Sequence, residues 1–254
     1  MEKFYYLFYS FIIYSFLGWV LEVIYHLLRE KRFINRGFLR GPVCPIYGTT
    51  AVLLIILIDI ISNNYIYIFV AGALIASIIE LVTGYVLEAA FNTRWWDYSN
   101  LKFNIKGYVC LRFSIFWGII SVFFAKIINP KVSKIVYLIV DKNNKLVFIT
   151  VLIILLLDII FTINNLIAFK RLFTEIQDIL MEIKNNVDKL MNEKINKESI
   201  LIIDKRINAL KESKEKLLLK INLRQRRLLK AYPRLNSKKF ESAIEEIKKK
   251  IKKK

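Results

Sequence analysis

The amino-acid sequence predicts an all-α polytopic membrane protein with about five transmembrane helices and a basic cytoplasmic tail. Of its 254 residues 56% are apolar, although the formal net charge is +19; soluble domains are about 45–50% apolar. The apolar residues and the positive charge lie in different parts of the chain. Residues 1–169 are apolar and carry a net charge of only +6, whereas the shorter segment 170–254 carries a net charge of +13. We therefore predict a transmembrane domain over 1–169 and a basic coiled-coil tail over 170–254. This excludes a disordered chain and a disulfide-rich secreted domain.

Five apolar stretches are about as long as, or longer than, the roughly 20 residues that a helix needs to cross a bilayer core of about 30 Å. The fourth is the weakest, because Arg112 and Lys126 lie near its ends. The stretches cover about residues 4–28, 44–62, 65–91, 108–128 and 146–169.

Lysines and arginines in the loops predict the orientation, because cytoplasmic loops are enriched in both. The first loop holds five of them between residues 29 and 40 and the third loop three between residues 94 and 106, whereas the second has none. We therefore expect a multi-pass protein of the bacterial plasma membrane with its N-terminus outside and its tail in the cytoplasm. The fourth loop disagrees, since five lysines between residues 126 and 145 would lie outside. Its apolar run 135–140 is too short to span and is expected at the interface.

An internal repeat with an offset of 66 residues relates the first and third stretches. GWVLEVIY, which starts at Gly18, aligns with GYVLEAAF, which starts at Gly84, and without a gap GPVC, ending at Cys44, aligns with GYVC, ending at Cys110. We predict two units, about 4–62 and 65–128, related by a rotation about the membrane normal. The fifth stretch stands outside the repeat. Chance similarity between two membrane helices is the alternative.

Five acidic residues lie within the apolar stretches, where an ionised side chain costs at least about 2.5–3.5 kcal/mol at mid-bilayer. One of them, Asp59, lies near an outer helix end and is expected to be hydrated; the other four are candidates for a role. Glu22 and Glu88 are repeat equivalents near the inner ends of their helices, Glu80 shares a helix face with Glu88, and Asp158 lies deep in the fifth stretch. They form either a polar seam for a cation, a proton or a substrate head group, or buried ion pairs that fix helix packing. We favour ion pairs for Glu22 and Glu88 and a functional role for Glu80 and Asp158.

The first inner loop carries a motif rich in turn-forming residues. Glycine and proline at this density are incompatible with a regular helix. The segment either dips into the helix bundle, where protein or a water-filled cavity covers it, or forms a tight turn at the interface. The motif consists of Asn35, Arg36, Gly37, Gly41, Pro42, Cys44, Pro45, Tyr47 and Gly48.

The third loop carries an aromatic motif, Trp95-Trp96-Asp97-Tyr98-Ser99. Its tryptophan and tyrosine side chains are typical of the aromatic belt at a membrane interface. Asp97 is expected to cap the turn by accepting hydrogen bonds from neighbouring backbone amides. Elsewhere the sequence has no metal-binding pattern and no P-loop, Rossmann or GxSxG motif, so we expect no metal, no cofactor and no enzymatic activity. The two cysteines are expected to stay reduced on the cytoplasmic side.

The tail repeats apolar residues with the 3,4 spacing of a coiled coil, first over residues 173–190 and then over residues 200–221. The two stripes are out of phase across residues 192–199, which fits either a phase slip in one continuous helix or an antiparallel hairpin. Pro233 should end the helix and leave a short basic helix at 238–254. Because the tail has few aromatic residues and lies beside an anionic leaflet, we favour docking on lipids, on a partner helix or on a second copy over binding to nucleic acid.

These motifs resemble a family of bacterial, mainly Firmicutes, membrane proteins described as ABC-transporter type IV or ABC-transporter permease-like. The resemblance rests on residues 14–22, on the loop 35–48 and on residues 96–107; the tail segment 232–238 is also similar. It implies a permease that works with a separate ATPase subunit. The alternative function class is a membrane scaffold or sensor that does not transport and that signals through its coiled coil.

Overall fold

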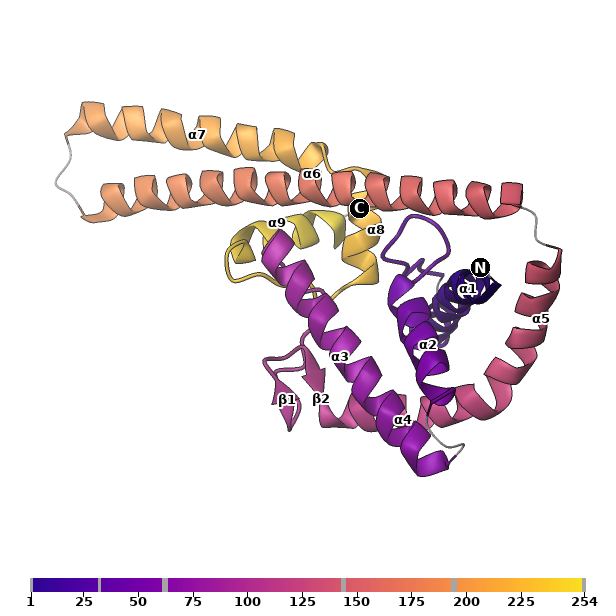
Figure 1. Cartoon of the computed structure of the whole chain (residues 1–254). Helices are drawn as coiled ribbons and strands as arrows, with labels where there is room; N and C mark the ends of the chain where they lie inside the picture. The colour runs from indigo at the N-terminus through magenta and orange to yellow at the C-terminus, as the bar shows by residue number, and fades with distance from the viewer. Residues whose placement is uncertain (1, 32, 61–63, 143–144, 193–195, 253–254) are drawn as a thin grey trace.

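The computed structural model describes residues 2–31, 33–60, 64–142, 145–192 and 196–252, and the regular secondary structure of this part is helical apart from one short two-stranded hairpin and an isolated bridge. Four of the described helices are long and apolar enough to cross a membrane. The chain is therefore an all-α polytopic membrane protein, as its sequence predicts. Its elements (Figure 1) are α1 (Glu2–Glu30), α2 (Pro45–Ile58), α3 (Tyr65–Phe91), β1 (Asn104–Ile105), β2 (Val109–Cys110), α4 (Leu111–Phe123), the π-helical turn η1 (Phe124–Ile128), α5 (Asn129–Asp141), α6 (Lys145–Asn192), α7 (Lys197–Leu219), α8 (Leu223–Ala231) and α9 (Glu241–Lys252).

The second predicted span is a shorter helix, which corrects the expected number of five long helices. With 14 residues, α2 is about 21 Å long and falls short of a bilayer core of about 30 Å. It begins at Pro45, whose missing N–H is tolerated in a first helical turn, and it ends before the exposed Asp59. Residues 61 and 62 of the predicted span lie outside the described part. The four candidate spans are Glu2–Leu28, Tyr65–Phe91, Leu111–Asp141 and Lys145–Met191.

The predicted fourth loop is helical instead. Through η1, α5 continues α4, and the two form one curved helical segment at the side of the molecule (Figure 1). Val132, Val136 and Val140 recur every four residues and are buried, and α5 packs on α1. The apolar face formed by these valines explains the helix, and their spacing is its signal in the sequence.

Small residues allow close packing in the membrane part. Among the described elements, α1 with α2 and α3 with α4 form the most extensively packed pairs. Gly72, Ala76, Glu80 and Gly84 lie four residues apart on the buried face of α3. A side chain at Gly72 would collide with Ser121 of α4. Small residues let helices approach closely where lipid supplies no hydrophobic driving force between them.

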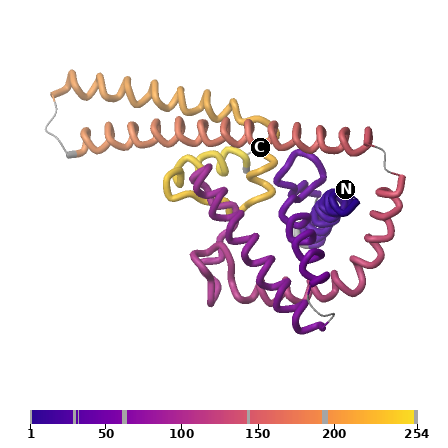
Figure 2. The backbone as a smooth tube through the Cα atoms, in the orientation of Figure 1, coloured from indigo at the N-terminus to yellow at the C-terminus, as the bar shows by residue number. Residues whose placement is uncertain are grey.

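The tail is an antiparallel hairpin followed by two helices that fold back. No break divides α6 at residue 169, the predicted domain boundary, and α7 lies antiparallel beside α6 (Figures 1 and 2). The structure thus has the hairpin and not the continuous helix; residues 193–195 of the connection lie outside the described part. Asn196 caps α7 by accepting a hydrogen bond from the Ser199 backbone at 2.9 Å.

A buried apolar core joins the tail to the third loop, so the tail is not a free coiled coil. In Figure 1, α6 runs across the ends of α2 and α3 and is not parallel to them. In this view α8 and α9 lie beneath α6, and residues of both share a buried core with Trp95 of the loop. The core includes Leu166, Phe169, Phe173, Ile176, Leu218, Leu228, Leu235, Phe240, Ile247 and, from the loop, Trp95.

Candidate functional site

A cavity of about 620 Å³ lies where α1, α2, α3, α4 and α6 meet the first and third loops. An apolar pocket with a few convergent polar groups is the usual form of a small-molecule site. The charged residues in its lining are Glu22, Arg36 and Glu80. Aromatic residues form much of the remainder: Phe38, Tyr47, Trp95, Trp96, Tyr98, Trp117, Phe124 and Tyr232.

Glu22 is held by a tyrosine and an arginine. Tyr47, in the first turn of α2, donates a hydrogen bond to Glu22 Oε1 at 2.6 Å, and Arg36 Nε lies 3.6 Å from Glu22 Oε2. The Arg36 side chain also contacts His26, and its guanidinium lies 5.3 Å from the centre of the Tyr232 ring. A fixed cation therefore balances the charge of this carboxylate.

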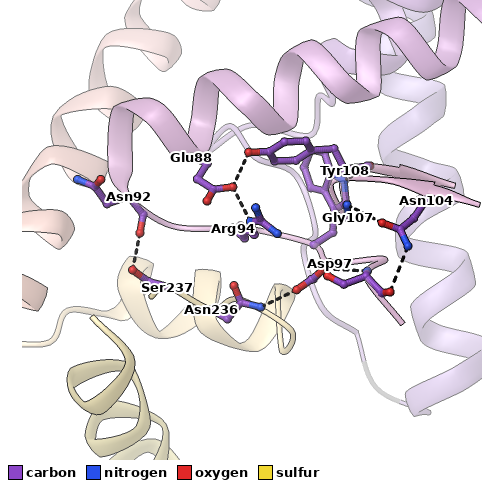
Figure 3. Close-up of polar contacts among 11 residues, drawn as sticks. Glu88, Asn92, Arg94, Asp97, Asn104, Gly107, Tyr108, Asn236 and Ser237 are labelled. Atoms are coloured by element: carbon purple, nitrogen blue, oxygen red, sulfur yellow. Dashed lines mark hydrogen bonds and ion pairs between the residues drawn. The ribbon is translucent and has the colours of Figure 1, made fainter. Parts of the chain in front are cut away.

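Glu88 has the same kinds of partner, although it lies outside the cavity lining. Arg94 Nε lies 2.5 Å from Glu88 Oε2, and Tyr108 donates a hydrogen bond to the same oxygen at 2.6 Å (Figure 3). The Arg94 guanidinium lies 5.0 Å from the centre of the Tyr108 ring. Both repeat-equivalent glutamates thus form an ion pair that a tyrosine hydroxyl supplements.

A glycine one turn before each glutamate makes this arrangement possible. A Cβ at Gly18 would come within 2.3 Å of Tyr47, and a Cβ at Gly84 within 2.8 Å of Tyr108. Only glycine therefore leaves room for the tyrosine ring whose hydroxyl reaches the glutamate one turn further on. The close approach gives a physical reason for the glycine and the glutamate in the repeated GxVLE block.

The second repeated block marks the starts of α2 and α4. Cys44 and Cys110 are the N-cap residues of these helices, and both thiols are buried and free. The tyrosines themselves are not repeat equivalents, since an offset of 66 pairs Tyr47 with a phenylalanine and Tyr108 with a proline. The rotation that relates the two units stays a prediction.

Glu80 differs from both of these glutamates. It is 8% exposed, and Tyr98 donates a hydrogen bond to its Oε1 at 3.0 Å. Its Oε2 is buried without a hydrogen-bond partner in the described part of the chain. Trp117 lies beside the carboxylate, and Tyr98 stacks on Phe113. A buried carboxylate with one unsatisfied oxygen therefore lines the cavity.

Asp158 of α6 holds the first loop in place. It accepts the backbone N–H of Arg40 at 3.0 Å on Oδ1 and that of Gly41 at 2.7 Å on Oδ2. Two hydrogen bonds from backbone amides to one carboxylate fix the loop where it turns toward α2. The structure thus gives Asp158 a loop-holding contact, and Asp158 is not part of the cavity lining.

Asn35 fixes the beginning of the same loop. Its Oδ1 accepts hydrogen bonds from the Trp19 indole at 2.8 Å and from the Gly37 backbone at 2.9 Å. At the other end, the Cys44 backbone donates to the Ser15 carbonyl at 2.9 Å. The loop therefore lies against the bundle, and its middle lines the cavity. Four motif residues are in that lining, Arg36, Cys44, Pro45 and Tyr47, whereas five are not: Asn35, Gly37, Gly41, Pro42 and Gly48.

The third loop is ordered by the turn that Asp97 caps. Its Oδ1 accepts a hydrogen bond from the Ser99 backbone at 2.9 Å. Burial raises the pKa of Asp97, but hydrogen bonds from Ser99 and Asn236 and the charge of Arg94 outweigh it, so the pKa lies below its usual value. Gly107 has a φ of +77°, and a Cβ there would collide with Asp97.

The tryptophans of this loop do not both have the predicted environment. Trp96 donates a hydrogen bond to the Tyr108 carbonyl at 2.9 Å and lines the cavity. Trp95 is only 5% exposed and packs edge-on against Phe38 and Tyr232. Its expected place in a lipid-facing aromatic belt is therefore wrong, because the tail covers it.

Tail residues 232–237 bind both the first and the third loop, a contact that the sequence did not predict. The Tyr232 hydroxyl donates to the Arg36 carbonyl at 3.0 Å; burial raises the pKa of Tyr232, so it remains a neutral donor. Asn236 and Arg94 exchange two backbone hydrogen bonds of 2.8 and 3.0 Å, and Ser237 donates to the Asn92 carbonyl (Figure 3). The only feature of the sequence that pointed to this contact was the similarity of residues 232–238 to the tail of the same family.

Fold and site together define a helical integral membrane protein with a cavity that two loops and the docked tail help to line. The chain belongs to the family described as Putative ABC-transporter type IV, which its sequence matches over residues 9–163. The match contains the cavity's two glutamates and the first and third loops, whereas α7, α8 and α9 lie outside it. The comparisons with curated proteins and with solved structures gave no match.

Proposed function

We propose that the chain is the ligand-binding, permease component of a transport system and that it works with a separate ATPase subunit. The cavity carries the proposal, because it combines an apolar aromatic lining with charged groups inside a bundle of membrane helices. Membership of a transporter family supports a transport-related role. Since the sequence has no P-loop, we assign ATP hydrolysis to another chain.

We further propose that the protein crosses the bacterial plasma membrane several times with its tail in the cytoplasm. The contacts of Tyr232 and Asn236 with the two basic loops support one common side for loops and tail. An excess of lysine and arginine favours the cytoplasmic side. There the tail would also be attracted to anionic lipids.

A scaffold or sensor role is the second candidate, and the α6–α7 hairpin favours it. This hairpin extends well beyond the packed helices (Figure 2). Its far part offers a surface for a partner helix or a second copy of the chain.

Co-purification tests both candidates. The tagged full-length chain is captured from native membranes in mild detergent, and bound proteins are identified by mass spectrometry against an unrelated tagged membrane protein. A P-loop ATPase in the capture, and ATP hydrolysis by the captured complex in nanodiscs, is the expected result. A kinase or regulator without an ATPase would support the sensor and overturn the transport proposal.

A further inference from the structure

We propose that the cavity binds an organic cation with an apolar body, such as a substituted ammonium or phosphonium ion, and that Glu80 recognises its charge. The inference deepens the proposed function and rests on it for transport, while binding itself is measured on the isolated protein.

The charges of the lining favour a cation. Arg36 lies 3.6 Å from Glu22, so these two residues largely cancel. Glu80 remains as the uncompensated acidic group among the described lining residues. An anionic ligand would meet this carboxylate in an apolar setting, where repulsion between like charges is strong.

The unsatisfied oxygen of Glu80 marks where the ligand's charge would lie. A buried carboxylate normally has a partner for each oxygen, because burying an ionised group without one is costly. Tyr98 occupies Oε1, and Oε2 has no partner within the described ranges. A bound cation supplies the missing partner at this oxygen.

The walls of the cavity favour an organic cation over a metal ion. Trp117 lies beside the carboxylate, and Trp96 and Tyr98 line the same space; aromatic faces attract cations and bury apolar substituents. A hard metal ion would need several oxygen ligands. The described residues contain no group of three His, Cys, Asp or Glu side chains arranged to hold one. A volume of about 620 Å³ suits a small organic molecule.

Two hydrophobic ions of similar size and opposite charge test the proposal. The full-length protein in nanodiscs is titrated with tetraphenylphosphonium and with tetraphenylborate, with empty nanodiscs as the blank. Three of the four tryptophans line the cavity, so their fluorescence reports binding. We expect saturable quenching by the cation and none beyond the blank by the anion.

Variants then test the role of Glu80. Glu80→Gln should weaken tetraphenylphosphonium binding by about ten-fold or more, which corresponds to about 1.4 kcal/mol. Glu80→Asp, which keeps the charge, should retain binding. Asp59→Asn is the matched control, because Asp59 is exposed and lies outside the cavity lining.

The outcomes separate this inference from the proposed function. Equal affinity of the wild type and Glu80→Gln, or binding of tetraphenylborate instead of the cation, overturns it, as does the absence of cation binding. If Glu80→Gln does not fold, Glu80→Asp and the two probes decide. Cation binding by a chain that captures no ATPase would support the inference and overturn the transport partnership.

Discussion

Glu80 and Glu88 lie two turns apart on α3, yet they differ in their partners. Glu88 forms an ion pair with Arg94 and accepts a hydrogen bond from Tyr108, whereas Glu80 accepts a hydrogen bond from Tyr98 and has no ion-pair partner among the described residues. Replacing a paired carboxylate by an amide leaves the partner cation unpaired; replacing an unpaired one leaves no such charge. The stability of amide variants therefore distinguishes the two residues.

We expect Glu88→Gln to lower the free energy of unfolding by about 1–2 kcal/mol and Glu80→Gln not to lower it, because the amide removes a buried charge that has no partner cation. The first value is below that of a fully buried pair, because the Arg94 and Glu88 side chains are 23% and 29% exposed. Thermal unfolding of the purified variants measures both, with Asp59→Asn as the control. A greater loss for Glu80→Gln than for Glu88→Gln would contradict the assignment.

The two repeat-equivalent glycines should differ in how much stability is lost when each is replaced by alanine. A Cβ at Gly18 meets the base of the Tyr47 side chain at 2.3 Å, whereas at Gly84 it meets the edge of the Tyr108 ring at 2.8 Å. Gly18→Ala should therefore destabilise the protein by about 1–3 kcal/mol, and Gly84→Ala by less, because a ring edge shifts more easily. Membrane abundance and melting temperature check the order, and a reversed order would argue against these packing contacts.

At the scale of elements, α6 holds the first loop by hydrogen bonds, although the two are far apart in the chain. Asp158 accepts the amides of Arg40 and Gly41, 118 and 117 residues away. The loop has no regular hydrogen bonding of its own, so these two contacts restrain its end.

Asp158→Ala should release this loop. We expect faster hydrogen exchange at Arg40 and Gly41 and a loss of about 1–3 kcal/mol, because two amides lose a charged acceptor. Asp158→Asn should have a smaller effect, since the amide keeps one acceptor oxygen. Exchange measured by mass spectrometry over residues 35–44 reports the change; unaltered exchange in Asp158→Ala would show that other contacts hold the loop.

The helices were more predictable than the contacts between them. The α3 helix has the bounds of its apolar run, because hydrophobicity and the Asn64 cap are local signals. The helix over residues 129–141 was missed because its lysines obscured the spacing of its valines. At the site, the sequence placed Glu80 and Glu88 on one face, but their different partners come from loops and could not be inferred from helix periodicity.

On the scale of the whole molecule, tail and loops form one assembly at one end of the bundle. Asn92 ends α3 at this end, and Ser237 of the tail contacts it. Asn64 caps the opposite end of the same 27-residue helix, about 40 Å away. The two ends of α3 should therefore lie on opposite sides of the membrane, and the tail should lie on the same side as Asn92.

Paired cysteine substitutions test this arrangement. A double variant that combines Asp97→Cys with Asn236→Cys, whose native side chains meet at 3.2 Å, should cross-link in intact cells, whereas one that combines Asn64→Cys with Asn236→Cys should not. In the single variants, an impermeant thiol reagent should label Asn64→Cys and spare Asn236→Cys, although both positions are exposed in the structure. Labelling of Asn236→Cys alone would reverse the proposed orientation, and failure of the first cross-link would contradict tail docking.

The contact between Trp95 and Tyr232 also sets an order of events during biosynthesis. The two rings lie 5.0 Å apart but are separated by about 140 residues of chain. At about 5–20 residues per second, roughly 7–30 seconds of translation separate them. During that interval the nascent chain exposes Trp95, and the loop reaches its final packing only when the end of the chain has been made. A message truncated before codon 232 would therefore yield an inserted protein with an uncovered aromatic surface, which quality-control proteases would recognise.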